Sequence, residues 1–478
     1  MLLVQKFGGT SVADADAIRR LVAIVMGGRG RPARGPAVVV SAMSGVTDGL
    51  LCVAADAAAA RLEPALAGLA KVRVRHAEAI GGLLTGARAA ETAACATAYL
   101  DQLESVVRGL ALLREVTPRT MDAITATGEL LSSRLVAAAV EEAGTPSTWI
   151  DARQVVVTSD EHGRAVPLAE PTYAALRAVV LATIEAGRVP VLGGFIGATV
   201  DGVTTTLGRG GSDYSGALVG AGIDADEIQI WTDVDGMLTA DPRVVPDPRL
   251  VQRLSYAEAS ELAYFGAKVL HPSTILPAVE RGIPVRIVNA QRPQGAGTLI
   301  TATPGTGPGP FAALACKRNL AVVNITSTRM LMAYGFLRKL FEVFERFRTE
   351  VDVVTTSEVS VSVTVEDRRS LDGIRQALEV FAEVAVEPDM ALVCAVGDGL
   401  MAQPTTIARM LGALDGVPLR MVSQAASRRN ITVVLADADV PDAMRRLHKE
   451  FFPALSDAAS GRSGGASPST SSGLRGMT

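Results

Sequence analysis

The pattern of apolar and polar positions divides the first 300 residues into short β-prone runs separated by longer amphipathic stretches. The run at 37–40 is apolar without interruption, which is typical of a strand buried on both faces. Residues 50–116 are rich in Ala, Leu and Arg with helical periodicity, so they predict a helical excursion, bounded at about 50–128. Because strands and helices alternate, the pattern predicts an α/β domain over 1–300, with a mainly parallel central sheet and helices on both faces. The predicted strands are residues 2–5, 37–40, 147–151, 189–197, 228–232 and 284–289.

The character of the sequence changes after a segment rich in glycine and proline. Residues 295–310 contain five Gly and three Pro, which predicts a linker between domains, placed at 301–311. From there to residue 455, strand and helix patterns follow the order βαββαβ twice, which predicts two ferredoxin-like units arranged as an internal repeat. Residues 456–478 are rich in Ser, Gly, Ala and Thr with little to bury, so we expect them to be disordered.

Composition and charge narrow the class of function. The chain of 478 residues is too long for one core and predicts several domains. With 46 Lys and Arg against 50 Asp and Glu, the net charge of −4 gives no basic field for nucleic acid or an anionic membrane, so small-molecule chemistry is favoured. Four widely spaced cysteines without a CxxC pair indicate neither a disulfide framework nor a zinc site. Without a charged leader or an apolar run approaching about 20 residues, we expect a cytoplasmic enzyme with no membrane contact.

A glycine-rich loop within residues 204–218 carries the main candidate chemistry. A β-prone run ends there in three glycines and a Ser, followed by small helix formers, so the segment predicts strand, loop and helix. Glycine permits close backbone approach, Ser212 is a suitable N-cap, and exposed N–H groups at a helix start favour an anion. Arg209 and Asp213 flank that anion site. The alternative interpretation is a surface turn that ends a hairpin.

Polar residues also follow the first two predicted strands. Lys6 ends the first strand just before a Gly-Gly turn, and Ser41 and Thr47 follow the second. The carboxyl ends of parallel strands converge at one rim, where open α/β sheets bind ligands, and this placement favours phosphate contact by Lys6. The alternative for a lone Lys is a solvated surface charge.

Residues further along the chain could contact a substrate or a nucleotide. Glu129, near the start of a predicted helix, could hold an ammonium group, or it could be a carboxylate that only stabilises the helix dipole. Asp235 and Asp241 precede Gly and Pro, so we interpret them as turn residues rather than metal ligands. His76 is interpreted as a surface or packing residue, and His271 as a residue that caps or packs a helix end. The residues that could line a nucleotide are Thr232, Asp233, Arg243 and Lys268.

Several motifs occur together in an order that resembles the aspartate kinases of the amino acid kinase family, over nearly the whole chain. The resemblance implies ATP-dependent phosphorylation of the β-carboxylate of L-aspartate, the first step toward lysine, threonine and methionine, with Mg²⁺ accompanying ATP and no metal ligand assigned in the chain. It implies Lys6 and Asp213 as the catalytic residues. The motifs lie at 6–12, 40–47, 127–129, 194–197, 204–214, 231–236, 241–243 and 266–272. The implied substrate-binding residues are Ser41, Thr47, Glu129, Arg209, Gly210, Gly211 and Ser212. The implied ATP-binding residues are Lys6, Gly8, Gly9, Thr10, Thr232, Asp233, Leu238, Arg243, Lys268 and Val269.

By the same resemblance the C-terminal repeat looks like paired ACT regulatory domains, the first at about 320–389 and the second formed by 312–319 with 390–455. Such domains pair across subunits and bind an amino acid, so we expect a homodimer or homotetramer and an amino acid effector, lysine before threonine. Asp352 would be the partner of the effector's ammonium group. The implied effector residues are Met330, Ala333, Gly335, Phe336, Leu337, Val351, Asp352, Thr356, Ser357 and Glu358.

Two positions depart from the pattern of the relatives that this chain resembles. Ala333 stands where lysine-inhibited members commonly carry Ser, which removes one possible hydrogen bond to the effector. Leu238 stands where many members carry Tyr, which predicts weaker or altered nucleotide selectivity with kinase activity retained. Met330 and Phe336, taken alone, would be interpreted as core residues.

The expected chemistry needs few special groups. A β-carboxylate with a pKa of about 3.9 is already ionised at neutral pH and requires no general base. Two other functions remain open: a kinase of the same fold for another acid, such as glutamate or a nucleotide, and a non-catalytic amino acid sensor. Intact Lys6, Arg209 and Asp213 argue against the sensor, and the paired C-terminal repeat argues against a simple glutamate or nucleotide kinase.

Overall fold

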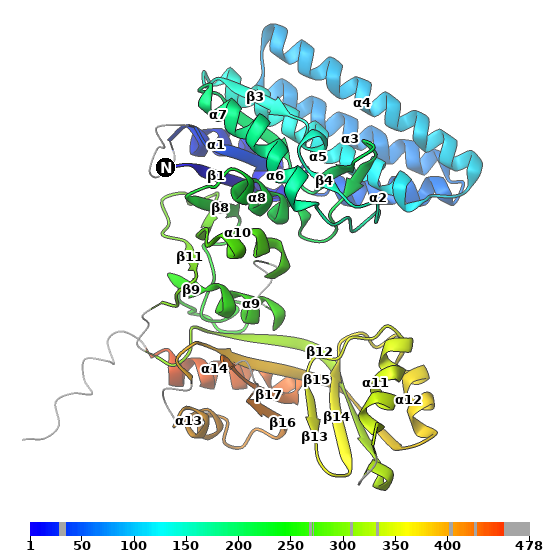
Figure 1. The fold of residues 1–478 in the computed structure, drawn as a ribbon, viewed down its shortest axis with the longest axis vertical. Coiled ribbons are helices and arrows are strands. Elements are labelled where there is room, and N and C mark those ends of the chain that lie inside the picture. Colours follow the sequence, from blue (N-terminus) through cyan, green and yellow to red (C-terminus); the bar gives the residue numbers. More distant parts are fainter. Residues whose placement is uncertain are drawn as a thin grey trace, which may run out of the picture.

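The structure of the protein, a computed structural model, describes residues 1–27, 35–266, 270, 272–305, 309–330, 334–400, 405–424 and 428–453. The described strands form an eight-stranded, a six-stranded and a three-stranded sheet. The eight-stranded sheet belongs to the N-terminal part of the chain and the six-stranded sheet to the C-terminal part, and the two lie one beyond the other along the long axis (Figure 1).

The eight-stranded sheet has the order β3-β5-β2-β1-β8-β10-β11-β9. Its neighbours run parallel except for the antiparallel pair β10 and β11, so the prediction of a mainly parallel sheet is confirmed. Strand β2 is buried along its whole length because its residues are apolar on both faces. The strands are β1 (Leu3–Phe7), β2 (Ala37–Val40), β3 (Ser147–Ile150), β5 (Val189–Gly193), β8 (Glu227–Thr232), β9 (Arg253–Ser255), β10 (Val285–Asn289) and β11 (Thr298–Thr301).

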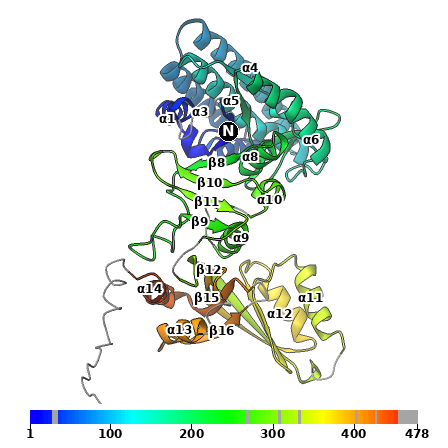
Figure 2. The ribbon, with the colours of Figure 1, turned by 60° about the vertical axis from the view of Figure 1, so that its left-hand side comes forward.

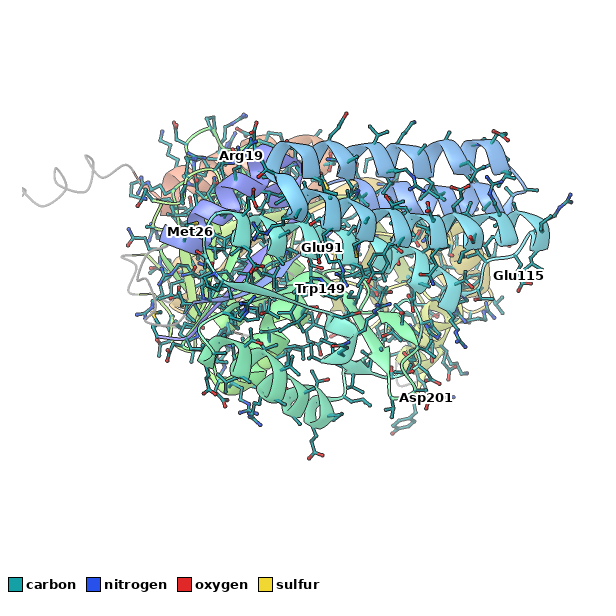
Figure 3. The ribbon with its side chains drawn as sticks, turned by 90° about the horizontal axis from the view of Figure 1, so that it is seen from above. Arg19, Met26, Glu91, Glu115, Trp149 and Asp201 are labelled. Atoms are coloured by element: carbon teal, nitrogen blue, oxygen red, sulfur yellow. The ribbon has the colours of Figure 1, made fainter. Side chains whose placement is uncertain are left out.

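Helices cover both faces of this sheet. Helix α8 packs against β1 and β2 on one face, while α1 and the layer α2–α5 share a core with Phe7 and Val38 on the other. The helical excursion predicted at about 50–128 corresponds to α2–α5, which extend over residues 46–142, and Figure 3 shows these long helices side by side, with Glu115 at the end of the layer. The helices are η1 (Gly9–Val12), α1 (Ala15–Gly27), α2 (Val46–Ala58), α3 (Leu62–Leu83), α4 (Gly86–Leu113), α5 (Pro118–Glu142), η2 (Ala152–Gln154), α6 (Ala169–Leu176), η3 (Arg177–Leu181), α7 (Ala182–Glu185), α8 (Gly211–Gly222), α9 (Tyr256–Tyr264), η4 (Pro272–Ile275) and α10 (Leu276–Arg281).

Helix α5 runs through the middle of the N-terminal part. By length and composition it could cross a membrane, but 83 % of its most apolar window is buried inside the protein, which identifies it as a core helix. It begins at Pro118, and the side chain of Thr117 caps it by accepting a hydrogen bond from the Thr120 N–H (3.2 Å). The prediction that Glu129 lies near the start of its helix is therefore wrong, because Glu129 lies in the helix interior.

A small sheet of order β4-β6-β7 lies beside the eight-stranded sheet and leads into the glycine-rich loop. Strands β6 and β7 form an antiparallel hairpin, whose turn lies at Asp201 and Gly202 (Figure 3). The glycine-rich loop instead joins β7 to α8, so the alternative of a turn that ends a hairpin is wrong. The strands are β4 (Val157–Thr158), β6 (Ile196–Thr199) and β7 (Thr204–Thr206).

The C-terminal sheet is antiparallel throughout, with the order β13-β14-β12-β15-β17-β16. Its two central strands, β12 and β15, are long enough to serve both βαββαβ units, so the predicted repeats form one continuous sheet. The register between them shifts near Asn319, whose φ of +61° marks the point where one unit meets the other. The elements are β12 (Ala313–Thr326), η5 (Thr328–Met330), α11 (Phe336–Arg346), β13 (Val354–Thr356), β14 (Ser360–Val365), α12 (Leu371–Glu379), β15 (Glu383–Val396), α13 (Thr406–Ala413), β16 (Leu419–Gln424), β17 (Asn430–Ala436), η7 (Asp437–Asp439) and α14 (Val440–Phe451).

The two parts of the molecule meet where β11 and β9 form one edge of the eight-stranded sheet, and α9 lies between this edge and strands β12 and β15 of the C-terminal sheet (Figure 1, Figure 2). The Leu314 N–H donates to the carbonyl of Thr239 (2.8 Å), and the Thr239 hydroxyl contacts His448 Nε2 at 2.9 Å. Burial of His448 in this junction lowers its pKa. The prediction that all of 295–310 is a linker is wrong, since β11 lies within it and pairs in the eight-stranded sheet.

Candidate active site

Lys6 and Asp213 form a largely buried ion pair where β1 meets α8. Lys6 Nζ lies 2.6 Å from Asp213 Oδ1, and the two side chains are 8 % and 18 % exposed. The alternative of a solvated surface lysine is therefore wrong. The pair forms because α8 can approach β1 closely: a Cβ at Gly216 would lie only 3.1 Å from Lys6 Cβ. At this distance the carboxylate and the ammonium group are in direct contact, so Asp213 fixes the position of the Lys6 ammonium.

The glycine-rich loop changes the chain direction between β7 and α8. Gly208 and Gly210 have φ values of +75° and +73°, which an L side chain would adopt only with strain. Gly210 is the N-cap of α8 and provides no side-chain hydrogen bond, so the prediction of Ser212 as N-cap is wrong. Ser212 lies within the first turn, where its hydroxyl accepts a hydrogen bond from Ser41 Oγ (2.9 Å).

Arg209 lies at the tip of this loop and is exposed. Among the described residues it has no hydrogen-bonding or ion-pair partner. Its guanidinium is therefore available to bind a carboxylate with two parallel hydrogen bonds.

Glu129 presents a buried carboxyl group close to the end of β2. It is 3 % exposed, and Oε1 accepts a hydrogen bond from the Ala42 N–H (3.2 Å). Its second oxygen, Oε2, has no partner among the described residues. Burial raises the pKa of Glu129 to about 8, so the group is mostly protonated at neutral pH. The helix-dipole interpretation is wrong because Glu129 lies far from the N-terminus of α5.

Close backbone approach brings these groups together. A Cβ at Gly193 would lie 3.1 Å from Glu129 Cβ, and a Cβ at Gly194 would lie 2.9 Å from Ser212 Cα. The carbonyl of Ser41 accepts a hydrogen bond from the Ser132 hydroxyl of α5 (2.7 Å). The ends of β2 and β5 therefore hold α5 and α8 close together, and Thr47 lies directly beyond in the first turn of α2.

The residues proposed for ATP divide into two groups. The Gly8 N–H donates to the carbonyl of Trp231 (3.1 Å), so the turn after β1 lies beside the end of β8, where the Thr232 hydroxyl donates to Asp233 Oδ1 (3.2 Å). Gly9 and Thr10 belong to the adjoining turn η1. Leu238 and Arg243 instead lie on the segment that packs against the C-terminal sheet. Lys268 and Val269 lie outside the described residues, as does His271.

Asp241, Asp235 and His76 were interpreted from the sequence as structural residues rather than ligands. Asp241 forms a turn by accepting hydrogen bonds from the backbone and guanidinium of Arg243, which lower the pKa of Asp241. Asp235 accepts a hydrogen bond from Asn289 Nδ2 (2.8 Å). His76 is buried and its Nδ1 contacts the carbonyl of Val72 (2.8 Å), as a packing residue should. Within the described ranges, no group of three His, Cys, Asp or Glu side chains is placed to hold a metal ion.

The residues proposed for an effector cluster around α11 and β13. Phe336 packs in the core of the first unit against Phe381, so it is a core residue, and Met330 packs at its edge. Asp352 Oδ1 already pairs with the ammonium of Lys317 (2.8 Å), whereas its Oδ2 is buried without a partner among the described residues. Ala333 lies outside the described residues. Of the others, Val351 is half-buried, and Gly335, Leu337, Thr356, Ser357 and Glu358 are exposed.

One buried carboxylate beside the glycine-rich loop was missed by sequence reasoning. Asp122 of α5 is 1 % exposed and accepts hydrogen bonds from His162, Gly163 and Thr206. These partners lie 40 to 84 residues away in the chain, so no local pattern marks Asp122 as special.

Comparisons with known proteins agree with this architecture. The model of the amino acid kinase family matches residues 1–289, and an ACT domain model matches residues 393–451. Aspartokinase 1, chloroplastic, of Arabidopsis thaliana is 34 % identical over 94 % of this chain and 80 % of its own length. Lysine-sensitive aspartokinase 3 of Escherichia coli is 35 % identical over 94 % of this chain and 99 % of its own length.

Solved structures of E. coli aspartokinase III have the same fold. The T-state complex with lysine and aspartate has a TM-score of 0.80 at 33 % identity, covering 94 % of this chain and 99 % of that chain. The R-state complex with aspartate and ADP has a TM-score of 0.79 at 33 % identity, covering 95 % of this chain and 100 % of that chain. The protein therefore belongs to the aspartokinases of the amino acid kinase family, with C-terminal ACT domains.

Proposed function

We propose that the protein transfers the γ-phosphoryl group of ATP to the β-carboxylate of L-aspartate, giving 4-phospho-L-aspartate and ADP. The observation that carries this proposal is the buried Lys6–Asp213 pair at the start of α8, next to a glycine-rich loop whose Arg209 is unpaired among the described residues. The solved E. coli relative that holds aspartate and ADP supports the same chemistry.

The site contains complementary groups for an amino acid with two carboxylates. The unpartnered Oε2 of Glu129 can receive the α-ammonium group, and Arg209 can bind the α-carboxylate. The hydroxyls of Ser41 and Ser212, which contact each other at 2.9 Å, can donate to the acceptor once it replaces that contact. The β-carboxylate of the acceptor, which is already ionised and nucleophilic, would then point toward Lys6.

Phosphoryl transfer requires positioning and charge neutralisation rather than proton transfer. Lys6 would neutralise charge on the γ-phosphoryl oxygens, and the Gly8–Gly9 turn would offer its backbone at the same rim. Asp213 orients the Lys6 ammonium. Mg²⁺ is typically held by substrate phosphates with one or two carboxylates, and Asp213 would contribute such a carboxylate. When bound, Mg²⁺ would supply further neutralisation of phosphate charge.

An assay of ADP release tests the proposal against its alternatives. ADP should form with ATP and L-aspartate, and the rate should depend on the aspartate concentration. Formation of ADP with L-glutamate or a nucleotide but not with aspartate would indicate a kinase for another acid. Absence of ADP with every acid would indicate a sensor.

The C-terminal sheet is proposed to bind lysine and thereby lower turnover, as the name of the lysine-sensitive relative suggests. The buried, unpartnered Oδ2 of Asp352 supports an ammonium ligand at this position. We further propose that the protein forms a homodimer or homotetramer through these sheets, which its molar mass in solution would test. Its proposed location is the cytoplasm.

Lysine is expected to reduce the rate of ADP release and to raise the melting temperature. A ligand at about 100 times its Kd stabilises the folded state by about 2.7 kcal/mol, which is ample for detection by thermal unfolding. Norleucine, which has the same chain without the terminal ammonium, should have little effect, and threonine should have less effect than lysine. If neither lysine nor threonine changes turnover or melting temperature, the regulatory proposal is wrong.

Leu238→Tyr is expected to lower KM for ATP and to raise the preference for ATP over GTP. Leu238 is half-buried and pairs with Leu250 through a backbone bridge, so its position is fixed while its side chain offers no hydroxyl to a nucleotide. Leu238→Phe is the matched control, because it adds the ring alone. The measurement is turnover with ATP and with GTP for all three proteins. Equal ATP/GTP ratios in all three would show that residue 238 does not contact the nucleotide.

A further inference from the structure

The Asp122 carboxylate collects hydrogen bonds from two separate segments of the chain. Oδ2 lies 2.7 Å from His162 Nδ1, the Gly163 N–H donates to Oδ1 (3.0 Å), and the Thr206 hydroxyl donates to the same oxygen. A carboxylate that is 1 % exposed is stable only when its oxygens are satisfied in this way. Asp122 therefore ties α5 to both the 160–165 segment and the end of β7.

Both tied segments border the glycine-rich loop. Thr206 is the last residue of β7, and its carbonyl accepts a hydrogen bond from the Ala165 N–H (2.9 Å). The carbonyl of Gly163 lies 3.2 Å from the place that a Cβ on residue 208 would occupy. The 160–165 segment thus forms a wall directly against Gly208, and Asp122 holds this wall and β7 in one arrangement.

Besides this wall, the loop is held by a hydrogen bond from the Leu207 N–H to the carbonyl of Phe195 (2.9 Å) and by one within its own turn, from the Gly211 N–H to the carbonyl of Gly208 (3.0 Å). Arg209 is exposed and has no partner among the described residues, and the residues on either side of it are glycines with positive φ. Glycine gives a loop wide conformational freedom, which costs entropy when a ligand orders it. A support that orders the loop before the ligand arrives increases affinity by reducing that cost.

We propose that Asp122 is a positioning residue for the acceptor. By holding Gly163 and Thr206 it sets the place of Arg209, and so determines affinity for the α-carboxylate of the amino acid substrate. The inference rests on the proposed function, since it assigns the Arg209 loop to the acceptor. Asp122 itself does not touch the reacting groups.

The first test separates acceptor binding from nucleotide binding. Asp122→Ala should raise KM for aspartate about 10-fold or more, whereas KM for ATP should change less than 2-fold; Asp122→Asn, which keeps one acceptor oxygen, should fall between Asp122→Ala and the wild type. Thr172→Val is the matched control. Thr172 is fully buried and holds β4 of the same small sheet through Val157 (3.1 Å), without bonding to the loop or its wall. It should leave both KM values unchanged.

The second test needs no activity and so distinguishes failure of this inference from failure of the proposed function. Hydrogen exchange at the amides of 207–211 should be faster in Asp122→Asn than in the wild type without ligand, and unchanged in Thr172→Val. If exchange is faster in Asp122→Asn but the protein makes no ADP with aspartate, Asp122 still positions the loop, and only the proposed reaction is rejected. Unchanged exchange in Asp122→Asn would overturn the inference. The inference would also fail if Asp122→Ala and Thr172→Val shifted KM for aspartate and KM for ATP by the same factors.

Discussion

Lys6→Met is expected to lower kcat for ADP release by about 10²- to 10³-fold, the range found when one charge-stabilising donor is removed from a transition state. Methionine keeps the unbranched stem that fits against Gly216, whereas the ammonium group that contacts Asp213 at 2.6 Å disappears. KM for aspartate should change much less than kcat, because the acceptor is assigned to Glu129 and Arg209. The measurement is coupled ADP release at saturating ATP and aspartate.

Stability must be separated from catalysis in this variant, since Lys6→Met leaves the largely buried Asp213 without its cation. Removing one partner of such a pair is destabilising because the other charge stays uncompensated. The double variant Lys6→Met/Asp213→Asn removes both charges and should recover most of the lost melting temperature. Its turnover should stay low. Turnover near the wild-type rate in Lys6→Met would remove Lys6 from the mechanism.

The fold was predictable where a local pattern decides it. The uninterrupted apolar run of β2 and the alternation of strands with helices predicted a parallel sheet, which is confirmed. The resemblance grouped residues 312–319 with 390–455, and residues 313–317 of β12 do pair with residues 392–396 of β15. The joining of the two units into one continuous sheet was not predicted, because it depends on β12 and β15 each running through both units. The strand β11 was hidden for a similar reason: the glycines and prolines around it outweigh four residues whose pairing is tertiary.

The candidate site shows the same division. Lys6 and Asp213, which the resemblance implied as the catalytic residues, lie together as an ion pair. The details that depend on backbone geometry were not predicted correctly. Ser212 has the residue type of an N-cap, yet the positive φ of Gly210 starts α8 earlier and frees Ser212 to meet Ser41. The burial of Glu129, which decides its protonation, also depends on packing that no single stretch of sequence contains.

Aspartate binding is expected to depend on pH through Glu129. Burial raises the pKa of this carboxyl group from 4.5 to about 8, so in the free protein at pH 7 it is mostly protonated and carries no charge for an ammonium group. A proton must then leave when aspartate binds. KM for aspartate should fall as pH rises from 6 toward 8, by up to about tenfold per pH unit, and should level off above the pKa. Initial rates at several aspartate concentrations across this pH range measure the profile.

Glu129→Gln should remove this dependence together with most of the affinity. The amide keeps the shape and can still accept a hydrogen bond from the Ala42 N–H, but it cannot become the anion that the substrate's ammonium requires. KM for aspartate should therefore rise by about 10- to 150-fold, since a hydrogen bond to a charged group is worth roughly 1.5–3 kcal/mol. The residual KM should be flat between pH 6 and 8.

Stability gives an independent check on the same carboxyl group. The pKa of Glu129 is higher in the folded state than in the unfolded state, so below about pH 4.5 the protonated group contributes fully to the stability of the folded wild type. This contribution is lost as pH rises toward 8, because the buried group must then ionise. The glutamine variant has no such group, so its melting temperature relative to the wild type should increase steadily between pH 4.5 and 8. Glu78→Gln, at an exposed position on α3, is the control and should show no such trend. A constant difference in melting temperature, together with a wild-type KM that does not change with pH, would mean that Glu129 is already ionised in the free protein.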